Sequence, residues 1–129
     1  MNEQLIVKNP ATGEELGYVT IDTAEKVKEK LKAGFLAFQQ FSKSSAYERA
    51  NLLMNWANLI LNNREDLAQI ITKENGKPLT EARGEVDYSA SYLTWFAEEA
   101  KRLYGLISPA NRNNKKLLVT QQGIVLVAA

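Results

Sequence analysis

The spacing of hydrophobic positions changes along the chain, and this change separates strands from helices. Residues 5–7 form a short apolar run, residues 9–15 (NPATGEE) carry Pro and Gly at turn positions, and residues 16–21 return to β-favouring side chains. From about residue 23 to residue 103, apolar residues recur every three or four positions, which is typical of amphipathic helices. The pattern therefore predicts a pair of short strands followed by a long helical region.

Capping residues divide this helical region into four helices. The starts are marked by Asp22 with Glu25, Ser45 with Glu48, Asn63 and Thr80. Gly76 with Pro78 is a stop signal, and Gly105 is another. We expect helices over about 23–41, 45–62, 63–75 and 80–104.

Each expected helix carries an apolar stripe. The stripes are Val27, Leu31, Phe35, Phe38 and Phe41; then Leu52, Leu53, Trp56, Leu59 and Ile60; then Leu67, Ile70 and Ile71; and last Val86, Ala90, Leu93, Ala97, Ala100 and Leu103. The second stripe is expected to be buried. For Trp56, Trp95, Phe38 and Phe96, core packing is favoured over stacking on a nucleotide.

The C-terminal part predicts a polar loop over 108–116 and two extended stretches, LLVTQQ and GIVLVAA. Two strands at each end hold too little sheet for a doubly wound fold, so the chain is predicted to be α+β and helix-dominated. No repeat or linker divides it. GIVLVAA has no polar alternation, which is typical of a strand covered on both faces. Little in the chain is left to cover it, so we expect a piece of a larger protein.

Composition narrows the function classes. The 129 residues include 16 basic and 15 acidic side chains, and the net charge of +1 gives no reason to expect a nucleic-acid partner. No apolar run approaches the roughly 20 residues that cross a bilayer, and the N-terminus lacks a signal-peptide layout. The expected location is the cytoplasm, with no membrane contact.

The chain contains no Cys and no His, which excludes thiolate nucleophiles, imidazole bases, disulfides and the usual Zn sites. A small enzyme using two facing carboxylates stays as a weak alternative, although the sequence singles out no such pair. Gly76, Lys77 and Pro78 lack the upstream Gly, the following Ser or Thr and the preceding strand of a Walker loop. They are interpreted as a helix stop and turn.

Three segments resemble the N-terminal region of the aldehyde dehydrogenase superfamily: NPATGEE at 9–15, KENGKP at 73–78, and EVDYSASYLTWFAEEAKRLYG at 85–105. The similarity is collinear over essentially the whole chain, and the third segment most resembles the succinate-semialdehyde dehydrogenase branch. The resemblance implies a fragment of an α/β aldehyde dehydrogenase fold over 1–129. Residues 1–107 would supply the strand pair and helices, and 115–129 a strand arm that enters the oligomerisation and cofactor-domain sheet.

The resemblance also implies a function for the complete protein. That protein would oxidise an aldehyde with NAD or NADP, and the first candidate substrate is succinate semialdehyde. The Cys nucleophile, the Glu base and the cofactor-binding residues of the family all lie beyond Ala129, so no catalytic or cofactor-binding residue is assigned here. Alone, the chain is expected to be inactive and to bind no cofactor. Arg49, Arg64 and Arg83 are not assigned to the substrate carboxylate. The alternative is a non-catalytic subunit-association module.

The resemblance also implies binding contacts for two residues and one segment: a substrate contact, a cation ligand and a subunit contact. Tyr88 matches a position at the mouth of the family's substrate tunnel, although an ordinary half-buried helix aromatic is the favoured interpretation. Glu74 matches a carboxylate that helps bind a structural monovalent cation, together with a backbone carbonyl near Lys8, but a solvated last-turn Glu is the simpler interpretation. The arm 115–129 is expected to join subunits into a homo-oligomer.

Overall fold

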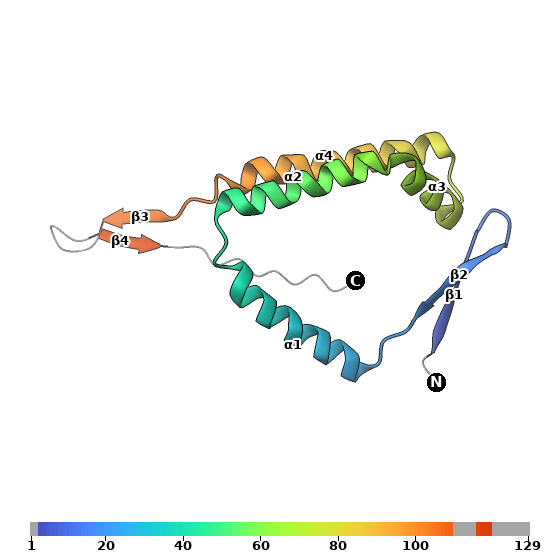
Figure 1. Cartoon of the computed structure of the whole chain (residues 1–129), viewed down its shortest axis with the longest axis horizontal. Helices are drawn as coiled ribbons and strands as arrows, with labels where there is room; N and C mark the ends of the chain where they lie inside the picture. The colour runs from blue at the N-terminus through green and yellow to red at the C-terminus, as the bar shows by residue number, and fades with distance from the viewer. Residues whose placement is uncertain (1–2, 110–115, 120–129) are drawn as a thin grey trace.

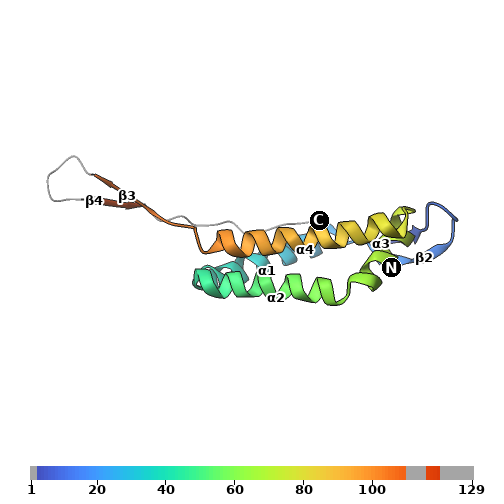
Figure 2. The same cartoon turned by 90° about the horizontal axis from the view of Figure 1, so that it is seen from above.

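The computed structural model describes residues 3–109 and 116–119. Its elements in chain order are β1 (Gln4–Lys8), β2 (Glu15–Thr20), α1 (Ala24–Phe41), α2 (Ala46–Asn62), α3 (Arg64–Asn75), α4 (Leu79–Ala100), β3 (Leu106–Pro109) and β4 (Lys116–Val119). Helices α2 and α4 lie antiparallel against each other, with α3 packed at one end (Figure 1). The two hairpins extend at opposite ends (Figures 1 and 2), and α1 lies apart from the helix pair (Figure 1). The predicted helix-dominated α+β class is confirmed.

The first hairpin forms where the strand pattern predicts it. Strands β1 and β2 pair antiparallel, with Ile6 opposite Tyr18 and a register shift after Val7. In the connecting turn the Asn9 side chain accepts a hydrogen bond from the Ala11 amide at 2.9 Å, as Asn does in turns that it stabilises. The hairpin then leads into α1.

Two helix starts can be compared with their predicted capping boxes. At α2 the box is confirmed, because Ser45 Oγ accepts from the Glu48 amide at 3.1 Å and Glu48 Oε2 accepts from the Ser45 amide at 2.6 Å. At α1 the predicted Asp22 cap is wrong by one residue. Thr23 Oγ1 accepts from the Lys26 amide at 3.3 Å, while the Asp22 carboxylate is paired with Lys30.

The predicted caps of the third and fourth helices are also corrected. Asn63 makes no cap bond to α3, because its side-chain amide instead donates to the Leu59 carbonyl at 2.8 Å and ends α2. Helix α4 begins at Leu79 after Pro78, so Thr80 lies inside its first turn. The Gly76 stop is confirmed by a left-handed φ of 71°. Helix α4 ends at Ala100, before the expected Gly105 stop.

Small side chains form the seam between the helices. The buried residues are Ala50 and Ala57 of α2, Ala68 of α3, and Ala82, Val86, Ala90, Ala97 and Ala100 of α4. Methyl groups let two helix backbones approach closely, but each removes little apolar area from water, worth less than about 1 kcal/mol. The described residues therefore fold around a thin core.

The expected burial of the large side chains is only partly confirmed: Leu53 and Ile60 are half-buried against the buried clusters, but the other members of the α2 stripe are not. In α2, Leu52, Trp56 and Leu59 are exposed, and in α4 Trp95 and Phe96 are exposed as well. The physical reason is that Ala50 and Ala57 already occupy the side of α2 that meets α4, and the larger residues point away from it. The described part of the chain contains nothing that covers them.

The C-terminal strands differ partly from expectation. The stretch Leu106–Pro109 is a strand, β3, which pairs antiparallel with β4 with Ile107 opposite Leu118, so the predicted polar loop begins later than residue 108. Residues 110–115 and the predicted GIVLVAA strand at 123–129 lie outside the described residues. Within the described residues, no helix is long and apolar enough to cross a membrane.

Two crossed ion pairs fasten α3 to α4. Arg64 of α3 donates to both carboxylate oxygens of Asp87, with Nε–Oδ1 at 2.5 Å and Nη2–Oδ2 at 2.6 Å. Arg83 of α4 likewise donates to both oxygens of Glu65 at 2.8 and 2.7 Å. Bidentate pairs of this kind orient both partners. The hydrogen bonds from Arg64 and Arg83 hold the pKa of Asp87 and Glu65 below their ordinary values.

The lowered pKa values predict acid sensitivity of the contact between α3 and α4. A carboxyl whose pKa is lower in the folded state stabilises the fold above its unfolded pKa, about 3.9 for Asp and 4.3 for Glu, and this stabilisation is lost as the pH falls through the folded value. The double variant Asp87→Asn with Glu65→Gln should therefore have a lower urea midpoint than the parent at pH 7 and lose less of it below pH 4. Equal midpoints at pH 7 would contradict a contribution from these pairs.

Candidate functional site

Four aromatic residues of α4 form a continuous surface, which we call the aromatic face: Tyr88, Tyr92, Trp95 and Phe96. Residues 88, 92 and 95 are spaced by four and three positions, so they share one side of the helix, opposite the alanine seam. The Tyr88 and Tyr92 rings meet edge-on with centroids 4.9 Å apart, and the Tyr92 and Phe96 centroids lie 6.1 Å apart. Contacts along the helix therefore fix the orientation of three of these rings.

Tyr88, the predicted tunnel residue, lies at the N-terminal end of this face. Its side chain is exposed, and its hydroxyl donates a hydrogen bond to the Tyr92 hydroxyl at 3.2 Å. This hydrogen bond raises the pKa of Tyr88 above its ordinary value of about 10. The phenol is therefore neutral near pH 7 and available as a donor or acceptor, but it is not a base.

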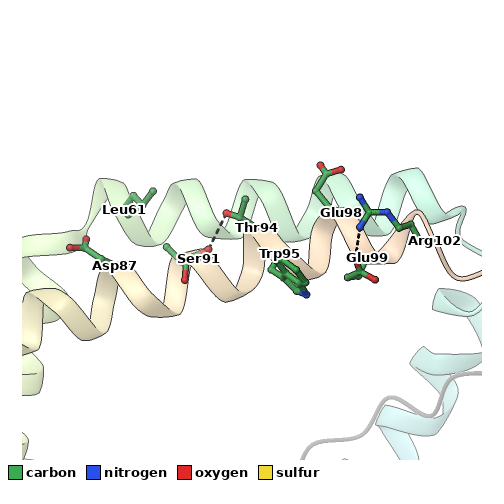
Figure 3. A pocket seen from close by; sticks show the side chains of 9 residues that line it. Leu61, Asp87, Ser91, Thr94, Trp95, Glu98, Glu99 and Arg102 are labelled. Atoms are coloured by element: carbon green, nitrogen blue, oxygen red, sulfur yellow. Dashed lines mark hydrogen bonds and ion pairs between the residues drawn. The ribbon is translucent and has the colours of Figure 1, made fainter.

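Two shallow grooves accompany the aromatic face. One, of about 530 Å³, is lined mostly by α4 residues, with Leu61 contributed by α2 (Figure 3). The other, of about 480 Å³, is lined by Ser91, Tyr92, Trp95 and Phe96. The Ser91 and Thr94 hydroxyls donate to carbonyls of their own helix, at 2.7 Å to Tyr88 and 3.0 Å to Ala90. The grooves thus present aromatic and aliphatic surface with few free polar groups.

The carboxylates along the larger groove are all paired with cations. Asp87 is held by Arg64, Glu98 by Lys101 at 2.9 Å, and Glu99 by Arg102. The hydrogen bond from Lys101 lowers the pKa of Glu98, as that from Arg64 lowers the pKa of Asp87. Such groups stay ionised at neutral pH and make poor general acids. Nothing in the described residues supports the alternative of a small carboxylate enzyme.

The other candidate residues lie away from the aromatic face. Glu74 is exposed in the last turn of α3, and the described residues contain no group of three acidic ligands that could hold a metal ion. Lys77, next to the Gly76 turn, is paired with Glu85. Its ammonium group is therefore engaged within the chain, which fits a helix stop better than a phosphate loop. Arg64 and Arg83 are occupied by their carboxylates, so neither is free to hold a substrate anion.

Sequence reasoning missed the aromatic face because it assigned Trp95 and Phe96 to the core. A signal for the face was nevertheless present in the sequence. On α4 the small residues Ala90 and Ala97 form one stripe, and the large aromatics form a second stripe on the opposite side. A helix with apolar residues on two opposite sides is expected to be covered on both.

The whole length of the chain, residues 1–129, matches the aldehyde dehydrogenase family. The chain belongs to this family, and the predicted resemblance is confirmed. Together with the open helical arrangement, the match identifies the chain as an aldehyde dehydrogenase N-terminal region.

Among individual relatives, the chain is similar to the NADP-dependent succinate-semialdehyde dehydrogenase of Escherichia coli, with 42% identity over 98% of the chain and 26% of the relative. It is 44% identical to a glutarate-semialdehyde dehydrogenase of Pseudomonas aeruginosa, over 95% of the chain and 26% of the relative. It is also 44% identical to a 3-sulfolactaldehyde dehydrogenase of Pseudomonas putida, over 98% and 26%. The chain thus spans about a quarter of the length of these curated relatives.

A solved structure shares the arrangement of the elements. The crystal structure of an NADP-dependent enzyme of E. coli aligns with a TM-score of 0.85 and 42% identity, covering 90% of this chain and 24% of that one. At this score the two structures share the fold of the aligned part of the chain. The open arrangement in Figure 1 is therefore also that of a region inside a chain about four times as long.

Proposed function

We propose that this chain is the N-terminal part of an NAD(P)-dependent aldehyde dehydrogenase that oxidises a short aldehyde carrying a distal anion, with succinate semialdehyde as the first candidate. The reaction would convert R–CHO, water and NAD(P)⁺ into R–COO⁻, NAD(P)H and two protons. The observation that carries the substrate class is the shared chemistry of the relatives' named substrates. Succinate semialdehyde and glutarate semialdehyde bear a distal carboxylate, and 3-sulfolactaldehyde bears a sulfonate.

The proposal assigns no dinucleotide site to the described residues. The one Gly-Lys turn, at Gly76 and Lys77, ends a helix, and Lys77 is paired with Glu85. The larger groove is bordered by Asp87, Glu98 and Glu99, and each of these carboxylates is already paired with a basic side chain, so the paired cations are engaged within the chain. The proposal therefore places NAD(P) binding and the chemical step in the part of the enzyme that would follow Ala129, and assigns neither to the residues described.

The activity test uses the protein as it occurs in its source cells. An antibody raised to this chain should detect a species several times heavier than 14.5 kDa, and the immunopurified species should reduce NAD or NADP with succinate semialdehyde. Propanal, of similar size without the anion, is the matched control and should be oxidised less efficiently. Equal kcat/KM for the two aldehydes would contradict the substrate class. A species of 14.5 kDa alone would instead favour the association-module alternative.

Tyr88 is proposed to line the substrate path of this enzyme. In the active protein, Tyr88→Phe would remove the hydroxyl that bonds Tyr92 while keeping the ring. We expect kcat/KM for succinate semialdehyde to fall by about two- to tenfold, the range for loss of one hydrogen bond. The matched control is Tyr47→Phe, at an exposed position of α2. Unchanged rate and aldehyde preference in Tyr88→Phe would remove the proposed role.

Glu74 is proposed to supply one oxygen ligand to a structural monovalent cation in the complete enzyme. Supporting this, the Gly76 turn just after Glu74 lies close to Pro10, so the loop after Lys8 and the end of α3 are neighbours. A backbone carbonyl from this loop could complete part of an oxygen shell.

The arm 115–129 is proposed to associate with other subunits, and residues 1–107 to form the strand pair and helices beside it. In a two-stranded sheet such as β3–β4, each strand has one edge without a described partner, and such edges add further strands. Val119→Lys at the end of β4 should shift the solution mass towards the monomer in light scattering. Val19→Lys in the other hairpin is the matched control. A mass unchanged by Val119→Lys would exclude this strand as the contact.

A further inference from the structure

The helix pair is apolar on both of its outward sides. Helix α4 presents the aromatic face, where Trp95 is 67% and Phe96 is 52% exposed, and α2 presents Leu52, Trp56 and Leu59. The buried residues of this seam are Ala50, Ala97 and Ala100, with the half-buried Leu53 and Met54 packed against them. A layer of this kind is stable when something packs on it, because exposed apolar patches of this extent are rare on monomers.

Helix α1 shows the same excess of uncovered apolar surface. Its stripe includes Val27, Leu31 and Phe35, all exposed, and the helix contains no buried residue. It makes no extensive contact with any other helix among the described residues. Figure 1 shows α1 held apart from α2 and α4. Contacts within the described residues therefore do not explain why α1 lies where it does.

The comparison with a solved structure supplies the explanation. Helix α1 makes no extensive contact with the helix pair, yet the chain aligns with the E. coli enzyme at a TM-score of 0.85 over 90% of its length. In that enzyme the matched region is 24% of the polypeptide. A spatial arrangement kept without mutual contacts requires a third body between or beside the elements. The remaining three quarters of such a polypeptide is the body that the coverage indicates.

We propose that the aromatic face and the α1 stripe (Val27, Leu31 and Phe35) form a docking frame for the polypeptide that follows this region in an aldehyde dehydrogenase subunit, and that this polypeptide is bound even when supplied as a separate chain. A second copy of this chain is the alternative occupant, and a homodimer in place of the two-chain complex would contradict the proposal. This inference rests on the proposed function for the identity of the partner.

The test supplies the partner in trans. The 129-residue chain is coexpressed with the E. coli succinate-semialdehyde dehydrogenase polypeptide lacking its matching first quarter, and native mass spectrometry measures the complex. We expect equal amounts of the two chains in each complex. A peptide-bonded fusion of the same two parts serves as the reference for a folded partner. If the fusion is soluble and the separate chains give no complex, or the partner stays insoluble beside this chain, the proposal is wrong.

Variants locate the contact. Trp95→Ser and Phe35→Ser should each weaken the complex by at least about tenfold, as truncation of a central aromatic does. Tyr104→Ser, which removes an equally exposed aromatic beyond the end of α4, is the matched control and should bind as the parent does. Circular dichroism of each free variant confirms that its helices are retained. Equal loss of affinity in all three variants would overturn the assignment of the frame.

The result separates this inference from the proposed activity. A complex that forms and depends on Trp95, yet oxidises propanal as well as succinate semialdehyde, supports the docking frame and contradicts the substrate class. An active fusion with no complex between separate chains supports the activity and contradicts docking in trans.

Discussion

Replacing Ala97 with Asp should abolish the packing of α2 against α4. Ala97 is 1% exposed at the seam, where Ala50 and Ala100 are its buried neighbours. A carboxylate at this position would be buried without a cation or a hydrogen-bond donor, at a cost of roughly 3–5 kcal/mol. The seam is made of methyl groups that each contribute little, so a loss of this size exceeds what the contact can supply. We expect the helical signal of the isolated chain to collapse at 25 °C.

The control for this prediction is the same substitution at an exposed alanine. Ala37→Asp lies in the middle of α1 on its solvent-exposed surface, where only helix propensity changes, by less than about 0.7 kcal/mol. Urea denaturation followed by circular dichroism compares the two variants with the parent. If Ala97→Asp and Ala37→Asp have equal midpoints, the alanine seam does not form in solution.

Local signals in the sequence predicted the ends of elements better than their burial. The Ser45 and Glu48 box requires only four consecutive residues and is present as expected. The cap of α1 was placed on Asp22 rather than Thr23, because both are good cap residues and the pattern does not choose between neighbours. Asn63 lies between two helices, and only the structure shows that its side-chain amide donates to a carbonyl of α2 and not to the start of α3.

Burial could not be predicted, because it depends on which groups are available to cover a side chain. Trp56 and Trp95 have the helical spacing of core residues, and the family match supports a role inside a larger protein. Within the described residues they are exposed, since the alanines take the inner positions. Strand β3 was missed because it is four residues long and ends in Pro109, a residue typical of loops.

For the candidate site too, the sequence predicted one part and the structure added the other. The resemblance placed Tyr88 on a substrate path, and the structure adds that Tyr88 belongs to a row of aromatic rings joined by a hydrogen bond to Tyr92. Its role in the reaction stays a prediction, as does that of Glu74. The only signal for the aromatic face in the sequence was a second apolar stripe on α4, which needs a contact of its own.

The second large effect is expected at Gly76, where the first hairpin meets the corner between α3 and α4. Gly76 has a φ of 71°, and a Cβ added there would lie 3.0 Å from Pro10 Cγ and 3.5 Å from Ala11 Cβ. Gly76→Ala therefore combines left-handed strain of about 1–2 kcal/mol with a steric displacement of the hairpin of about 1–3 kcal/mol. The hairpin should come away from the helices and become an early site of proteolysis.

Gly13→Ala isolates the strain from the displacement. Gly13 has a similar φ of 78°, but nothing lies within 4 Å of an added Cβ, so only the strain of about 1–2 kcal/mol is expected. Urea midpoints and the rate of tryptic cleavage after Lys8 measure the difference between the two variants. Because both lose the same backbone freedom, the extra loss in Gly76→Ala reports the contact with Pro10. Equal losses would mean that the hairpin does not rest on this corner, and the proposed neighbourhood of Glu74 and the loop after Lys8 would lose its support.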